Sequence, residues 1–151
     1  MSELLEEAVL VGRARRPAGG WRDAIRVACD PLVEREAVSE HYPQRCIEMV
    51  EEHGPYIVLA PGIALAHARP EDGALRLAVA ATTLTEPVAF GHEDNDPVDL
   101  VFAFGSPDRD QHVGLLSALA TALLGGLADR LRAAEDDEAL QAALAEVGDG
   151  G

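Results

Sequence analysis

The run from Val98 to Phe104 is apolar at every position except Asp99. Strands buried on both faces carry such near-continuous apolar runs, whereas a strand with one wet face alternates apolar and polar residues. Packed layers are therefore needed above and below this strand. Other apolar runs and stretches of helical periodicity alternate along the chain. We expect an α/β fold: a three-layer domain with a central mixed β-sheet of about five strands and helices on both faces.

The expected strands are separated by residues that mark turns. Ala74–Leu84 is the longest of them and is rich in Leu, Val and Ala. Pro61 and Gly62 predict a turn between two short apolar runs. The sequence therefore predicts strands over Ala8–Gly12, Tyr56–Leu59, Ile63–Leu65, Ala74–Leu84 and Val98–Phe104.

The expected helices place apolar residues on one stripe. Pro31 lies inside the first helix, and we expect it to kink this helix or end it at Asp30. Ser39 is the expected N-cap of the second helix, and Gly54 the expected residue just past its end. The sequence predicts helices over Trp21 to about Arg35, Ser39 to near His53, Gln111–Leu124, Leu127–Ala134 and Asp136–Val147.

A chain of 151 residues, 48% of them apolar, suits a single domain over 1–151, with frayed ends at 1–7 and 148–151. Cys29 and Cys46 lie far apart in helical patterns, so we expect reduced thiols. The acidic first residues lack an apolar signal region, and no apolar stretch is long enough to span a bilayer. These features predict a soluble, cytoplasmic protein.

The formal net charge is −15, from 12 basic and 27 acidic residues, and every basic residue is arginine. Nucleic-acid binding needs a basic face to neutralise phosphates, so the composition argues against it. An acidic membrane surface would repel the chain. A basic partner protein would be steered towards it.

The run Gly54–Pro70 carries His67 out of an apolar stretch into a loop closed by Arg69 and Pro70. Histidine is the side chain best suited to gain and lose a group near neutral pH. His112 also lies where a strand region gives way to the next element, and α/β folds place their sites at strand ends. We expect the remaining histidines on the solvated surface; they are His41, His53 and His92.

Other chemistries have weaker support in the sequence. A zinc site would join His67 and His112 to Asp108 or Asp110, but no H-x-x-x-H or H-E-x-x-H spacing supports it. Ser106 stands in Gly-Ser-Pro, and no serine has the G-x-S-x-G pattern of a hydrolase nucleophile. A P-loop is excluded because the chain has no lysine.

The segment Gly-Pro-Tyr-Ile-Val-Leu-Ala-Pro-Gly-Ile-Ala-Leu-Ala-His-Ala-Arg-Pro at 54–70 resembles the phosphorylation-site segment of bacterial enzyme IIA domains. These domains belong to the phosphoenolpyruvate-dependent sugar phosphotransferase system, and the resemblance is to its mannitol/fructose/ascorbate branch, with ascorbate-type proteins closest. Further stretches are similar to the family in the same order along nearly the whole chain. They are Trp21–Arg26, Glu86–Gly91, Asp94–Val101, and His112 with Leu115, Leu116 and Leu119.

The resemblance implies a phosphotransferase component of sugar uptake. His67 would accept a phosphoryl group from the histidine-containing phosphocarrier protein and pass it to a cysteine of a IIB domain, which serves a membrane IIC component. His112 would hydrogen-bond to the phosphoryl oxygens or to the His67 ring. No cofactor or metal is implied, because fixed donors and arginines such as Arg69 and Arg109 can offset the charge.

Three positions depart from the family pattern. A proline commonly precedes the active histidine, and Ala66 stands there in this chain, so we expect a looser loop and an altered transfer rate. Mannitol-type members carry an arginine before the site, where this chain has Glu51 and Glu52. Pro31 interrupts a helix that the family usually continues.

Two alternatives share the same histidine. In one, the chain is a regulatory IIA-like module whose His67 phosphorylation state controls a binding partner such as a transporter, kinase or transcription factor. In the other, the domain is degenerate and transfers no phosphoryl group. The apolar content is compatible with a homodimer. The identity of the sugar is not encoded, because a IIA domain does not touch it.

Overall fold

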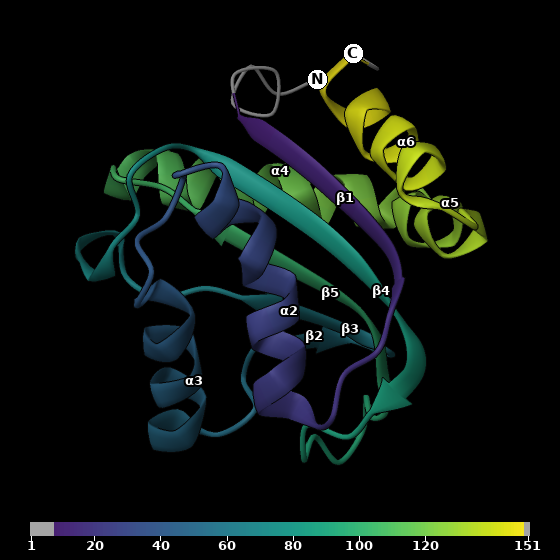
Figure 1. Ribbon diagram of the computed structural model, residues 1–151, viewed down its shortest axis with the longest axis horizontal. Helices are drawn as coiled ribbons and strands as arrows, with labels where there is room; N and C mark the ends of the chain where they lie inside the picture. The colour runs from purple at the N-terminus through teal and green to yellow at the C-terminus, as the bar shows by residue number, and fades with distance from the viewer. Residues whose placement is uncertain (1–7, 150–151) are drawn as a thin grey trace.

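The computed structural model describes residues 8–149. Their five strands form one mixed sheet in the order β1-β4-β5-β3-β2, with β5 at its centre (Figure 1). β1 is parallel to β4, β4 is antiparallel to β5, β5 is parallel to β3, and β3 is antiparallel to β2. The bounds are Val9–Arg16 for β1, Val58–Ala60 for β2, Ile63–Ala66 for β3, Ala78–Val88 for β4 and Val98–Gly105 for β5.

Helices cover both faces of this sheet (Figure 1). α2 (Trp21–Glu34) and α3 (Tyr42–His53) bury their apolar residues against one face. α4 (Arg109–Leu124), α5 (Leu127–Ala133) and α6 (Asp137–Asp149) cover the other. A short 3-10 turn, η1 (Pro70–Asp72), follows β3. The three-layer α/β architecture predicted from the sequence is therefore confirmed.

The central strand divides its side chains between two cores. Val101 and Ala103 of β5 face α2 and α3, whereas Phe102 and Phe104 face the helices on the other side. All four are fully buried. The continuous apolar run is thus explained, because neither face of β5 meets water.

The first helix runs on through Pro31 to Glu34, close to the expected end near Arg35, so the proline does not end it at Asp30. Proline removes one backbone donor from a helix. The turn around it nevertheless packs into the core through Ala28 and Leu32, both fully buried. The packing of this turn holds the helix together beyond the proline.

Ser39 does not cap the second helix, which begins at Tyr42. The Ser39 N–H donates instead to the Gly73 carbonyl at 2.8 Å, so this residue pairs with the segment after η1. The predicted terminator is confirmed: Gly54 ends α3 with φ of 85° and donates its N–H to Val50 at 2.8 Å.

Two strands differ from the expected bounds by four residues. β1 continues past Gly12 to Arg16, through a register shift at Arg15, whose φ is +56°. β4 begins four residues later than predicted, because the N–H groups of Leu75 and Arg76 both donate to the Ala37 carbonyl instead of joining the sheet.

The expected fraying at 1–7, 150 and 151 lies outside the described residues, and α6 extends to Asp149. Across 8–149, no single helix is long and apolar enough to cross a membrane. α4 and α5 reach that length only as a pair bent by 73°.

Candidate functional site

His67 is the first residue beyond β3, and it continues the strand face that carries Ile63 and Leu65. Its Nδ1 lies 3.0 Å from the Leu65 carbonyl oxygen. A carbonyl only accepts hydrogen bonds, so Nδ1 carries the ring proton and Nε2 keeps its lone pair. The fold therefore presents Nε2 as the nucleophilic nitrogen of this ring.

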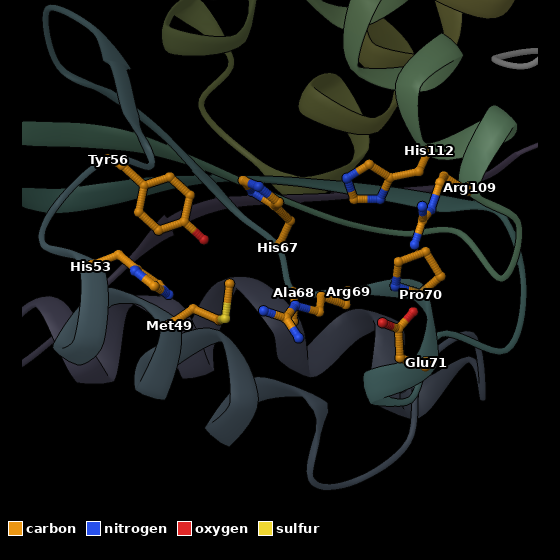
Figure 2. Close-up of a pocket in the computed structure, with 10 residues that line it drawn as sticks. All are labelled: Met49, His53, Tyr56, His67, Ala68, Arg69, Pro70, Glu71, Arg109 and His112. Atoms are coloured by element: carbon orange, nitrogen blue, oxygen red, sulfur yellow. The ribbon is translucent and has the colours of Figure 1, made fainter.

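His112 comes to the same place from the first turn of α4. Asp108 caps this helix, since its Oδ2 accepts the Gln111 N–H at 3.0 Å. The His112 and His67 ring centroids are 5.7 Å apart, with the planes at 58° (Figure 2). The structure thus brings together the two histidines that the sequence singles out.

Phe104 forms the floor beneath both imidazoles. Its ring stacks on His67 at 5.4 Å and 17°, and lies 4.8 Å from His112 at 49°. Tyr56 meets the His67 ring edge-on at 5.6 Å and 81°. Sequence reasoning assigned neither aromatic residue to the site, because each lies in an apolar run that predicts a strand.

The surroundings keep both imidazoles neutral at pH 7. Burial lowers the pKa of His67, and the Leu65 carbonyl opposes this effect more weakly. Burial also lowers the pKa of His112, and the nearby His67 lowers it further. A neutral ring is the form that can act as a nucleophile.

The rings open into a pocket of about 480 Å³ (Figure 2). Arg69 and Arg109 line this pocket, and both side chains are exposed. Over residues 8–146, no carboxylate lies within 4.0 Å of either guanidinium. The pocket therefore has two cations whose charge is free to meet an anion.

Two of the other three histidines are exposed as predicted, and the third is not. His41 and His53 are exposed as expected, although His53 also lines the pocket. His92 is half-buried, not exposed. Its Nδ1 accepts the N–H groups of Asp94 and Asn95 at 3.2 and 3.1 Å, so it organises its own loop.

The zinc alternative lacks a third ligand in this arrangement. The Asp108 carboxylate is engaged in capping α4, and Asp110 does not line the pocket. In the part of the chain whose side chains are described, 8–146, no three His, Cys, Asp or Glu residues are grouped to hold a metal ion.

The positions that depart from the family pattern have defined surroundings. Ala66 is the last residue of β3, is paired with Ala103 and is fully buried, so the ladder fixes the backbone that leads into His67. Glu51 does not line the pocket and forms an ion pair with Arg22 at 3.0 Å.

Comparison with known proteins identifies the family of the chain. Residues 10–147 match the family model of the phosphoenolpyruvate-dependent sugar phosphotransferase system, EIIA 2. The ascorbate-specific PTS system EIIA component of Shigella boydii is 39% identical over 128 residues, which cover 83% of each chain. The mannitol-specific cryptic phosphotransferase enzyme IIA of Escherichia coli has a TM-score of 0.83 at 29% identity, covering 96% of this chain and 99% of that one.

A further solved structure is the complex of enzyme IIA and phosphorylated enzyme IIB for mannitol from Escherichia coli. Its IIA chain has a TM-score of 0.73 at 25% identity, covering 89% of this chain and 93% of that one. The fold and its relatives define a phosphotransfer component of the sugar phosphotransferase system. The chain belongs to the EIIA 2 family of that system. The branch predicted from the sequence is confirmed.

Proposed function

We propose that His67 is the residue that carries the phosphoryl group. It accepts the group from the histidine-containing phosphocarrier protein and passes it to a cysteine of a IIB domain, during sugar uptake of the ascorbate or mannitol/fructose type. The observation that carries this proposal is the 3.0 Å contact between His67 Nδ1 and the Leu65 carbonyl. It assigns the proton to Nδ1 and leaves the Nε2 lone pair available beside His112.

The transfer proceeds in two displacements at phosphorus. In the first, the Nε2 lone pair forms a P–N bond while the P–N bond of the donor phosphohistidine breaks, and the donor ring leaves with the electron pair. The proton stays on Nδ1, which donates to the Leu65 carbonyl throughout. In the second, a IIB thiolate forms a P–S bond, and Nε2 recovers its lone pair.

The neighbouring side chains stabilise the charge of the group in transit. His112 is neutral, so one of its nitrogens carries a proton and can donate to a phosphoryl oxygen. Arg69 and Arg109 lie at the pocket wall and offset the negative charge. His112, which packs against Phe104, is a preorganised donor of the kind that stabilises a transition state without reorganising during the reaction.

The IIB partner is proposed from the mannitol relative. That IIA protein has been solved in complex with phosphorylated enzyme IIB, and its fold matches this chain over 89% of the residues here. A IIB protein that accepts the group would approach the same open pocket, because His67 Nε2 must reach its sulfur.

Labelling with phosphoenolpyruvate, enzyme I and the phosphocarrier protein tests the proposal. His67→Gln should carry no acid-labile phosphate, because the nucleophilic nitrogen is gone. His112→Ala should still be labelled at His67, at a rate lower by about 100- to 1,000-fold, the loss typical of one charge-stabilising donor. His41→Gln is the control, since this exposed histidine does not line the pocket. Full labelling of His67→Gln would refute the assignment.

The second half of the reaction needs its own measurement. Labelled protein should lose its phosphate rapidly to a cognate IIB protein, with the group appearing on cysteine. Labelled protein that transfers to no IIB, yet changes its affinity for another protein, would instead identify the regulatory module that shares this histidine.

A further inference from the structure

We propose that Tyr42 is a positioning residue of the phosphoryl-transfer site, holding the loop that carries His67 against the end of β5. The inference builds on the proposed role of His67. Tyr42 is the first residue of α3 and is fully buried. It does not line the pocket, so any effect on transfer must act through other residues.

One hydroxyl joins two segments of the site. The Tyr42 oxygen accepts the Ala68 N–H at 3.1 Å and donates to the Phe104 carbonyl at 2.9 Å. Ala68 is the residue after the nucleophilic histidine. Phe104 carries the ring on which both imidazoles rest. The hydroxyl therefore fixes the nucleophile relative to the floor of its own site.

The position of this hydroxyl in the sheet explains its effect. β3 and β5 pair in parallel until Ala66 and Ala103, and no further pair follows. If the ladder continued in register, the Ala68 N–H would donate to the Phe104 carbonyl. The Tyr42 hydroxyl stands between these two groups in place of that bond. An inserted oxygen opens the ladder at the point where His67 leaves the sheet.

The buried Tyr42 hydroxyl, with one donor and one acceptor as partners, is a rigid link between the two segments. Burial is the main cause that raises the pKa of Tyr42, so the hydroxyl stays protonated and continues to donate a hydrogen bond. Without the oxygen, the Ala68 N–H and the Phe104 carbonyl lose their partner and must pair directly or move apart. Either change displaces His67, and a shift of about 1 Å at a reacting group costs about 100-fold in rate.

α3 holds the next residue of the loop as well. Arg45, one turn after Tyr42, contacts Asp72 Oδ1 through Nε at 3.3 Å. The other oxygen of Asp72 accepts the Arg69 N–H at 3.1 Å. Two successive residues after His67 are thus tied to one face of this helix.

Tyr42→Phe removes the hydroxyl and keeps the ring. We expect the maximal rate of transfer from the phosphorylated phosphocarrier protein to His67 to fall by about 10- to 100-fold. The KM for this donor should change much less, because Tyr42 lies beneath the surface that meets it. The final amount of phosphate on His67 should stay at the wild-type level. Rapid-quench kinetics measures all three quantities.

NMR of the unphosphorylated chain gives a readout that does not depend on transfer. We expect the Ala68 amide and the His67 ring nitrogens of Tyr42→Phe to shift, with loss of the fixed Nδ1–H form. If wild-type protein were not labelled at His67, the proposed function would fail, and these NMR signals alone would decide whether Tyr42 positions the His67 loop. Wild-type ring signals in Tyr42→Phe, together with a wild-type transfer rate, would overturn the positioning role of Tyr42.

The matched control is Ile47, a buried residue on the same helix and in the same core. Ile47→Val or Ile47→Ala, whichever matches the thermal stability of Tyr42→Phe, should keep the wild-type rate and ring signals. An equal loss in this control would show that stability, and not position, is responsible. If Tyr42→Phe does not fold, Arg45→Gln at a half-exposed site replaces it. A wild-type transfer rate and wild-type His67 ring signals in Arg45→Gln would then overturn the proposal that α3 positions the His67 loop.

Discussion

At the scale of single residues, the site depends on two imidazoles that burial keeps neutral. Because the pKa of His67 and that of His112 are lowered, their neutral forms persist to more acidic pH than the usual pKa of about 6.5 allows. The single-turnover rate of His67 phosphorylation should therefore reach half of its plateau at a pH below about 6.5. NMR titration should place both rings below their values in the urea-unfolded chain. Titration at or above the unfolded values would contradict this account.

The same shift has a consequence for stability. Between the folded and the unfolded pKa values of these two rings, the unfolded chain binds more protons than the folded one. The free energy of unfolding should therefore decrease as pH falls through this interval. His67→Gln removes one of the two titrating groups and should weaken this dependence.

The residues that the sequence predicted for the site are those with chemically distinctive side chains. His67, His112, Arg69 and Arg109 meet in one pocket. Tyr42 was not predicted, because its partners are backbone atoms of residues far away in the chain, and backbone atoms leave no sequence pattern. A buried tyrosine shows its role only when the fold brings Ala68 and Phe104 together.

At the scale of elements, α6 completes an otherwise open sheet edge. Gln141 Oε1 accepts the Gly12 N–H at 2.6 Å, and its Nε2 donates to the Leu10 carbonyl at 2.8 Å. Asp137 Oδ1 accepts the Ala14 N–H at 2.7 Å. Side chains thus occupy the place of a sixth strand. They cover a sheet edge that could otherwise pair with a strand of another molecule. α6 approaches so closely that a Cβ on Gly12 would lie 2.8 Å from the Gln141 nitrogen.

Gln141→Ala should lower the free energy of unfolding by about 2 kcal/mol, because it leaves a backbone donor and an acceptor on β1 without partners. Urea unfolding measures the change. Glu146→Ala on the exposed side of α6 is the control and should stay within about 0.5 kcal/mol of wild type. Equal stability of Gln141→Ala and wild type would show that water replaces the side-chain bonds.

Element boundaries show where local sequence stops being informative. The type of each predicted strand and helix was correct, because periodicity reports which side of an element is buried. The strand start at Ala74 was wrong, and the alternative helix end at Asp30 did not occur, because tertiary contacts decide these boundaries. Packing of Leu32 continues α2 past its proline, and the Ala37 carbonyl holds Leu75 away from the sheet.

At the scale of the whole molecule, the net charge of −15 should affect how the donor protein approaches, but not the rate of phosphoryl transfer once it is bound. An acidic surface attracts a donor with a basic docking face, and this attraction acts over distances that salt can screen. The contacts around His67 act at hydrogen-bond range inside a partly buried pocket, where salt has little effect. Association and transfer should therefore respond differently to ionic strength.

Raising the salt concentration from about 0.1 M to 1 M shortens the screening length from about 10 Å to 3 Å. We expect the KM for the phosphorylated phosphocarrier protein to rise with salt, while the transfer rate at saturating donor stays constant. Steady-state kinetics across this range measures both, and a neutral osmolyte at equal osmolarity controls for changes in water activity. A KM that falls with salt would show that the donor approaches with an acidic face, so that screening relieves repulsion and steering plays no part in their encounter.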